Sequence, residues 1–84
     1  MHRTTPRFWK LLEDLPEAVQ KSAHESFQLL RANSRHPSLH FKKVGEFWSA
    51  RVGLTRRALA VPDDEDFIWV WIGAHDEYER MIGS

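Results

Sequence analysis

A run of six apolar residues closed by a glycine constrains the fold of this chain more than any other feature. The run, residues 67–72, is rich in aromatic and β-branched side chains, which favour a strand, and it is too short for a stable helix. His75 and Tyr78 follow the glycine almost at once. The sequence therefore predicts a buried strand that ends at a potential proton-transfer pair, since histidine titrates near neutral pH and a phenol donates a hydrogen bond.

The length of 84 residues supports one domain, residues 1–84, with one core. The chain has no cysteine, which excludes disulfides, zinc–thiolate sites and a thiol nucleophile. Its amino terminus lacks an apolar signal core, and its longest apolar run is far shorter than the roughly 20 residues that span a bilayer. We therefore expect a cytoplasmic protein that does not enter a membrane.

Charge is unevenly distributed along the chain, although the formal net charge is zero. Residues 35–57 carry one acid, Glu46, against six arginines and lysines: Arg35, Lys42, Lys43, Arg51, Arg56 and Arg57. Acidic residues dominate from Ala58 onward. The middle third is thus the part suited to a polyanion, and solvated loop and edge charge is the alternative interpretation.

The first half of the chain shows two helical patterns. Thr5 and Pro6 form a typical helix start, and Phe8, Leu11, Leu12 and Leu15 then fall on one face. Pro16 separates this helix from a second one, in which Val19, Ala23, Phe27 and Leu30 recur every three or four residues up to positions 32–34.

The second half changes to the alternation of strands. We predict strands over residues 39–44, 47–54, 57–61 and 67–72, a hairpin turn at Gly45-Glu46, and a short helix over about 76–81. Trp48, Ala50, Val52 and Leu54 form the apolar row of the second strand, so Arg51 projects from the opposite face. Residues before Thr5 could add an edge strand. The predicted class is α+β, with an N-terminal helical hairpin packed on a small antiparallel sheet of three or four strands and a short C-terminal helix.

Several kinds of chemistry find no support in the sequence. No serine stands in a G-x-S-x-G setting, and the glycines at positions 45, 53, 73 and 83 form no phosphate-binding loop. His36 and His40 are four residues apart, but Pro37 between them breaks a helical pair and no third ligand has a suitable spacing. We therefore expect neither a metal site nor a cofactor.

The remaining candidates are Arg51, Arg57, His75 and Tyr78, which lie on or after adjacent predicted strands. Cleavage of RNA without a metal needs a base for the 2′-hydroxyl proton, cations that hold the phosphate, and an acid for the leaving oxygen. This set contains all three, and arginine suits the phosphate because its fork binds two oxygens at once. The alternative is structural: His75 would begin the last helix, and Tyr78 would pack against the sheet.

The order of several short motifs resembles the RelE/ParE superfamily of bacterial toxins from type II toxin–antitoxin pairs. The motifs are Leu15-Pro16, His36-Pro37-Ser38-Leu39, Lys42-Lys43, Trp48-Ser49-Ala50-Arg51-Val52, Arg57-Ala58-Leu59 and Ile72-Gly73-Ala74-His75-Asp76-Glu77-Tyr78. Together they cover nearly the whole chain. The resemblance implies a compact sheet with a helical hairpin on one face and, in the RelE branch, an endoribonuclease that cuts messenger RNA on the ribosome and so stops translation.

The same resemblance implies roles for individual residues. Arg51 and Arg57 would hold the scissile phosphate, His75 would be the general acid or base, and Tyr78 would orient the nucleotide or assist proton transfer. Lys42, Lys43 and Arg56 would contact the RNA backbone. The implied partners are ribosome-bound mRNA and a small antitoxin that wraps the protein and blocks its basic face.

Two other functions stay open at the level of the sequence. One is a ParE-like toxin that poisons DNA gyrase without catalytic residues of its own. The other is a non-toxic module of the same fold that only binds a protein partner. The sequence also leaves open which residue removes the proton.

Overall fold

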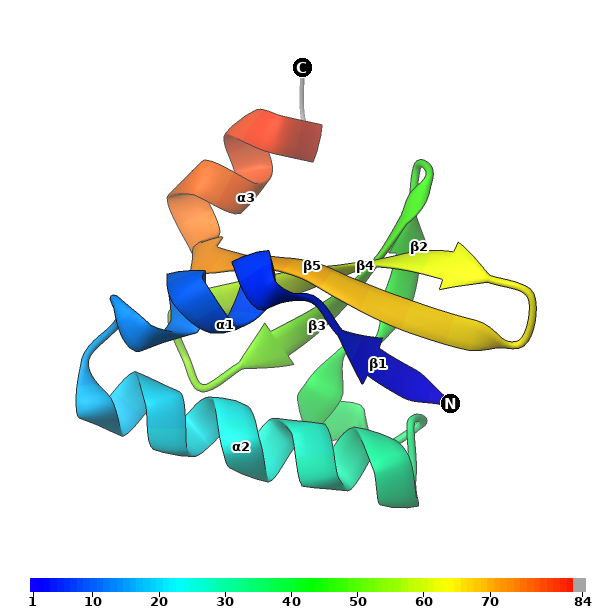
Figure 1. Cartoon of the computed structure of the whole chain (residues 1–84), viewed down its shortest axis with the longest axis horizontal. Coiled ribbons are helices and arrows are strands. Elements are labelled where there is room, and N and C mark those ends of the chain that lie inside the picture. The colour runs from blue at the N-terminus through cyan, green and yellow to red at the C-terminus, as the bar shows by residue number, and fades with distance from the viewer. Residues whose placement is uncertain (83–84) are drawn as a thin grey trace.

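The structure, a computed structural model, describes residues 1–82 and contains a five-stranded sheet with helices on both of its faces (Figure 1). In chain order the elements are β1 (His2–Thr4), α1 (Pro6–Glu13), α2 (Glu17–Ala32), the 3-10 turn η1 (Pro37–Leu39), β2 (Lys42–Val44), β3 (Phe47–Val52), β4 (Arg56–Asp63), β5 (Asp66–Ala74) and α3 (His75–Ile82). The predicted α+β class is confirmed.

The strands lie in the order β1-β5-β4-β3-β2. β2 to β5 form an antiparallel meander, whereas β1 pairs with β5 in parallel, with His2 opposite Phe67. The predicted edge strand before Thr5 is therefore present. The expectation of a purely antiparallel sheet of three or four strands was wrong, because β1 adds a fifth strand that pairs in parallel with β5. A parallel pair needs a crossover connection, and here the chain between β1 and β5 passes through both α1 and α2.

The helical hairpin begins and ends close to the predicted positions. Thr5 caps α1, since its Oγ1 accepts a hydrogen bond from the Phe8 amide at 3.2 Å, and the same hydroxyl donates to the Trp69 carbonyl at 3.0 Å. This pair of bonds ties the start of α1 to β5. None of the helices within residues 1–82 has the length and apolar character needed to cross a membrane.

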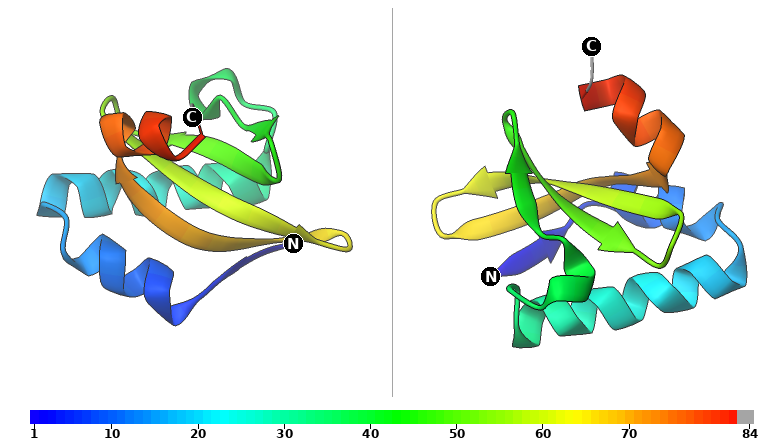
Figure 2. Two further views of the ribbon diagram at one scale, coloured as in Figure 1. Left: turned by 90° about the horizontal axis from the view of Figure 1, so that it is seen from above. Right: turned by 180° about the vertical axis from the view of Figure 1, so that it is seen from behind.

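Two hydrophobic clusters lie on the two faces of the sheet. The larger one joins α1 and α2 to the sheet, with Ala50, Ala58, Ala60 and Trp69 among its buried members. The smaller one lies under α3 and contains Leu59, Trp71 and Tyr78. Figure 2 shows the result, with α2 running beneath the sheet and α3 standing at the end of β5 on the other face. Much of that second face, over β2 and β3, is left uncovered by helices.

Two predicted strand ends differ from the structure. The first predicted strand was to begin at Leu39, but Leu39 is buried in η1 and His40 has a φ of 46°, so the strand begins only at Lys42. The second was to extend to Leu54, whose side chain is 86% exposed in the β3–β4 turn. In both places a turn breaks the alternation that the apolar residues suggested.

A bulge in β5 separates two tryptophans that a regular strand would place on one face. Leu59 pairs with Trp71 but Ala60 pairs with Trp69, so the ladder gains one residue on β5. Trp69 therefore packs in the larger cluster and Trp71 in the smaller one. Both rings are buried, as expected for core tryptophans.

Candidate functional site

A cross-strand pair of arginines lies at the centre of the candidate site. Arg51 of β3 is opposite Arg57 of β4, which in turn is opposite Gly73 of β5. Residues opposite each other in an antiparallel ladder project from the same face. Arg51 and Arg57 are two residues along their strands from Ser49 and Leu59, so they share the face that carries the α3 cluster. The prediction that Arg51 opposes the main apolar row is confirmed.

Arg57 is held against Tyr78. Its guanidinium carbon lies 5.2 Å from the centroid of the Tyr78 ring, a cation–π distance. One of its nitrogens, Nη1, is buried and has no hydrogen-bond partner within residues 1–82. Arg56 Nε has the same status, and a buried donor without an acceptor is energetically costly.

His75 begins α3 at the end of β5. Its backbone N–H donates to the Thr55 carbonyl at 3.1 Å, which links the start of the helix to the β3–β4 turn. Its ring Nε2 lies 2.8 Å from Glu79 Oε1, and its ring centroid lies 5.7 Å from that of Tyr78. The ring is thus held beside Glu79 and Tyr78 while 44% of the side chain is still exposed.

Tyr78 also has the structural role that the sequence allowed for it. The side chain is only 4% exposed and packs with Leu59 and Trp71. Its ring is both the support of Arg57 and part of the small core. The structure therefore brings Arg51, Arg57, His75 and Tyr78 to one end of the sheet, and the two interpretations of His75 and Tyr78 are compatible.

The structure separates the other three predicted RNA contacts. Lys42 is opposite Ser49 and so shares the face of the arginine pair. Lys43 is opposite Trp48, and Arg56 is opposite Val52 and Ala74, which places these two side chains on the face covered by the helical hairpin. Arg56 donates to the Thr55 hydroxyl at 3.1 Å. Only Lys42 can therefore extend the basic surface beside Arg51 and Arg57.

The acidic residues of the β4–β5 turn lie at the other end of the sheet from His75. Asp63 accepts a hydrogen bond from Arg3 at 2.6 Å, and Asp66 pairs with both Arg3 and the amino terminus. The hydrogen bond from the terminal ammonium is the main cause of a lowered pKa at Asp66. These acids consequently do not neutralise the arginine pair. Within the described range, no three histidine or acidic side chains cluster closely enough to bind a metal ion.

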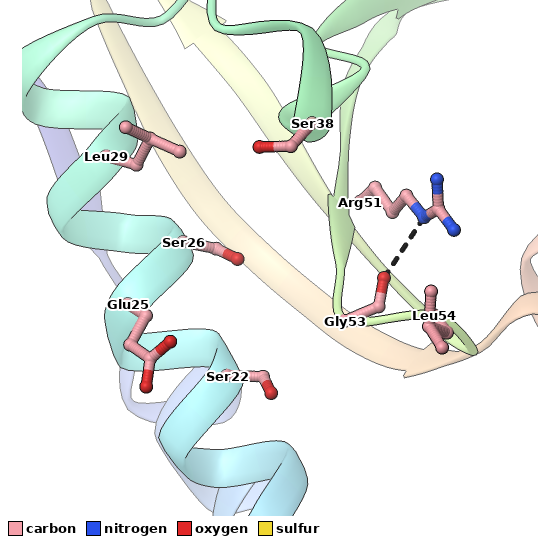
Figure 3. Close-up of a pocket in the computed structure, with 8 residues that line it drawn as sticks. All are labelled: Ser22, Glu25, Ser26, Leu29, Ser38, Arg51, Gly53 and Leu54. Carbon is pink, nitrogen blue, oxygen red and sulfur yellow. Dashed lines mark hydrogen bonds between the residues drawn. The ribbon is translucent and has the colours of Figure 1, made fainter.

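Arg51 also borders a cleft of about 360 Å³ between α2 and the edge of β3 (Figure 3). Its Nε donates to the Gly53 carbonyl at 3.0 Å, so the guanidinium is held beside the β3–β4 turn. Ser22 and Ser26 project into the cleft from α2, and Ser38 projects from the opposite wall. This cleft was not predicted from the sequence.

Sequence reasoning also missed the residues that shape the floor of the site. The indole of Trp71 lies across Gly73, where an added Cβ would be 2.5 Å from Trp71 Cζ2. Glycine at position 73 thus leaves room for the tryptophan ring beside Arg57. The contact between His75 and Glu79 was detectable, because residues four apart on a helix face each other.

Comparison with known proteins gives matches through structure alone. No protein-family model matches the chain, and no curated protein matches its sequence. Among solved structures, the toxin-bearing RelB–RelE antitoxin–toxin complex of Methanococcus jannaschii contains a chain with a TM-score of 0.72 at 17% identity, over 94% of this chain and 96% of that one.

Two further structures share the fold. A chain of the RelBE2 toxin–antitoxin complex of Mycobacterium tuberculosis matches with a TM-score of 0.63 at 25% identity, over 89% of this chain and 96% of that one. YafQ from Escherichia coli matches with a TM-score of 0.62 at 14% identity, over 93% of this chain and 96% of that one. Each of these three matches spans nearly the full length of both chains. This chain therefore has the RelE-like toxin fold.

Proposed function

We propose that this protein is the toxin of a toxin–antitoxin pair and acts as a metal-independent endoribonuclease on ribosome-associated mRNA. The observation that carries the proposal is the position of Arg51 directly opposite Arg57 on the face of the sheet that carries α3. Like charges directly opposite each other destabilise a sheet. A phosphate bound by both guanidinium groups would offset this repulsion.

The arginine pair suits the charge that develops during RNA cleavage. When the 2′-oxygen attacks the adjacent phosphorus, the O2′–P bond forms as the P–O5′ bond breaks, and negative charge increases on the non-bridging oxygens. Arg51 and Arg57 would bind these oxygens through their guanidinium groups, which stay charged throughout. Tyr78 would hold the Arg57 guanidinium in place, and Lys42 would bind a neighbouring phosphate.

His75 is the candidate proton acceptor. If Nε2 carries the ring proton and donates it to Glu79, then Nδ1 is free to take the proton of the 2′-hydroxyl. Glu79 would thus act as a positioning residue that selects the tautomer, as carboxylates do beside other functional histidines. The leaving 5′-oxygen takes a proton from water, and the hydroxide that remains takes the proton from His75, so that the products are a 2′,3′-cyclic phosphate and a 5′-hydroxyl and the histidine is neutral again.

The proposed partner is an antitoxin that covers the same face. Two of the similar structures are complexes of a toxin with its antitoxin. On the same face as the arginine pair, but at the other end of β3, this chain has an apolar groove of about 400 Å³ between the β2–β3 hairpin and the end of α3, bordered by Val44, Phe47 and Met81. An antitoxin segment with apolar side chains for this groove and acidic ones for Arg51 and Arg57 would block access of RNA.

The test is induced expression of the chain alone in a bacterial host, with the 5′ ends of a translated reporter message mapped in parallel. We expect growth arrest and new 5′ ends, both lost in His75→Ala and Arg57→Ala. Glu79→Gln should keep the fold but lower the cleavage rate by about 10- to 100-fold, as loss of an orienting partner does at other histidine sites. Circular dichroism of each variant shows whether it is folded.

The outcomes separate the proposed function from its rivals. Full cleavage by folded His75→Ala and Arg57→Ala would contradict the assignment of these residues. Growth arrest with intact message and reduced supercoiling would indicate a gyrase inhibitor instead. Growth without arrest would indicate a module of this fold that only binds a partner.

A further inference from the structure

A second cleft lies between the start of β1 and the end of α2, two segments that are side by side in Figure 1. Phe67, near the start of β5, borders it, whereas His75 follows the last residue of that strand. Its volume is about 670 Å³, within the range of roughly 300–1,000 Å³ that is typical of small-molecule sites. His2, Arg31 and Arg35 line the cleft, and none of its lining residues is acidic. The lining therefore suits an anionic ligand.

The tautomer of His2 gives this cleft a hydrogen-bond donor. The indole Nε1 of Trp69 can only donate, and it lies 3.1 Å from His2 Nδ1. Nδ1 must therefore accept, so the neutral ring carries its proton on Nε2. Within residues 1–82, Nε2 makes no hydrogen bond and is not among the buried unpartnered nitrogens. Its N–H is thus open to the cleft that His2 lines.

The guanidinium of Arg31 lies close to the ring of His2. Its central carbon is 5.9 Å from the centroid of the Phe27 ring, and that ring is 6.3 Å from the ring of His2. Burial is the main cause of the lowered pKa of His2, and the positive charge of Arg31 contributes to it. Arg31 makes no ion pair and no side-chain hydrogen bond within residues 1–82. Its charge and its five N–H donors are therefore available beside Nε2 of His2.

Two sources of negative charge lie nearby, and neither cancels the charge of Arg31. The end of α2 carries the negative end of the helix dipole, which is equivalent to about half a unit charge, so the full charge of Arg31 exceeds it. The acids of the β4–β5 turn precede Phe67 but do not line the cleft. Asp66 is paired with the terminal ammonium at 3.0 Å and with Arg3 at 3.4 Å. The cleft therefore keeps a positive character.

We infer that this cleft binds a phosphate group, held by the Nε2–H of His2 and the guanidinium of Arg31. The arginine fork takes two phosphate oxygens, and a third is left for the histidine. A carboxylate has only two oxygens, so the two side chains would have to share one of them. The site is separate from the Arg51–Arg57 pair, because it lies on the face of the helical hairpin and about 20 Å away along β5, at about 3.3 Å per residue. It does not depend on the proposed reaction.

The test is a titration of the full chain, labelled with ¹⁵N, with inorganic phosphate at about pH 7.5, above the ordinary histidine pKa of 6.5. The indole N–H of Trp69 reports on His2, because the two are hydrogen-bonded. The indole N–H of Trp9, which donates to the Thr4 hydroxyl at 2.8 Å, is the internal control. We expect saturable shifts of His2 Nε2 and of the Trp69 indole, and no shift of the Trp9 indole.

Variants and further ligands define the site. Arg31→Gln should weaken phosphate binding about tenfold or more, since it removes a charge-assisted contact. The matched control is Arg7→Gln, an equal charge change at an exposed position of α1 outside the cleft, which should bind as the wild type does. A 2′-O-methylated trinucleotide without a terminal phosphate offers only backbone phosphodiesters and resists cleavage. Binding of both ligands would indicate an RNA backbone as the source of the phosphate, and binding of inorganic phosphate alone would indicate a free or terminal phosphate.

Three results would overturn the inference: no shift of the Trp69 indole with phosphate, unchanged affinity in Arg31→Gln, or ¹⁵N shifts that place the His2 proton on Nδ1. Equal shifts with acetate would replace phosphate by a carboxylate and indicate an acidic peptide instead. The proposed reaction fails or holds separately. Arg57→Ala should abolish cleavage of message and leave phosphate binding beside His2 unchanged, whereas Arg31→Gln should weaken binding here and leave phosphate binding by the arginine pair intact.

Discussion

The guanidinium of Arg57 lies over the ring of Tyr78, 5.2 Å from its centroid, and this contact joins the end of the sheet to α3. The ring is 4% exposed, so it is part of the small core as well as the support of the arginine. Any test of Tyr78 has to separate the ring from the hydroxyl.

Tyr78→Phe keeps the ring and removes the hydroxyl, whereas Tyr78→Leu removes the ring. We expect the first variant to lose less than about 1 kcal/mol of unfolding free energy and the second to lose on the order of 1–3 kcal/mol, because a buried aromatic leaves a cavity. Urea denaturation measures both. If Tyr78→Phe also keeps full cleavage activity, the hydroxyl takes no part in proton transfer; if it loses activity with an unchanged fold, the role of Tyr78 as support alone is refuted.

Repulsion between Arg51 and Arg57 should lower the unfolding free energy of the protein when no phosphate is bound. Relative to Arg51→Lys, which keeps the charge, Arg51→Gln should be more stable by roughly 0.2–1 kcal/mol, since it removes a like-charge cross-strand contact. The gain should shrink as salt is added, because salt screens the repulsion. Equal stabilities of the two variants in low salt would show that the guanidinium groups do not repel each other. Both variants should lose activity, as lysine cannot bind two phosphate oxygens in a fixed plane.

Gly73 should tolerate no side chain while Trp71 keeps its position. In Gly73→Ala the new Cβ would lie 2.5 Å from Trp71 Cζ2, so the indole must move. We expect a loss of about 1–3 kcal/mol, the usual cost of overpacking, together with a change in tryptophan fluorescence. Gly45→Asn is the control, since nothing lies within 4 Å of a Cβ at this turn and asparagine tolerates its φ of 60°. Wild-type stability of Gly73→Ala would show that Trp71 does not depend on this glycine.

His2 should make stability depend on pH. Burial, followed by the terminal ammonium and Arg31, lowers the pKa of His2 from its ordinary 6.5, and Trp69 Nε1 donates to its Nδ1 at 3.1 Å. Folding thus favours the neutral ring. The unfolded chain binds the proton first as the pH falls below 6.5, so the stabilisation is complete above that pH and is lost below it.

The corresponding measurement is the unfolding free energy between about pH 7.5 and 5, a window around the ordinary histidine pKa. His2→Asn should flatten the decrease, because the amide oxygen can accept from Trp69 without titrating. His24→Asn, at an exposed position of α2, should leave the decrease as in the wild type. A wild-type slope that persists in His2→Asn would assign the effect to another group.

Much of the fold was predictable because local signals agree with the tertiary structure. Thr5 and Pro6 set the start of α1, Pro16 separates the two helices, and the apolar run from Phe67 to Ile72 lies in β5. The alternation in β3 correctly placed Arg51 opposite the apolar row. Each of these features depends on neighbours in sequence, where capping, proline geometry and period-two alternation act directly.

By itself, the sequence determined the class, the element order and the residue types available for phosphate chemistry, because these follow from local propensity and from side-chain chemistry. Only the tertiary structure decided which residues meet. The bulge in β5, opposite Leu59 and Ala60, sends Trp69 and Trp71 to opposite faces, and the strand register places Arg56 and Lys43 away from Arg57. A shift of one residue reverses the face of every side chain that follows, and pairing between distant strands, not the local sequence, sets that register.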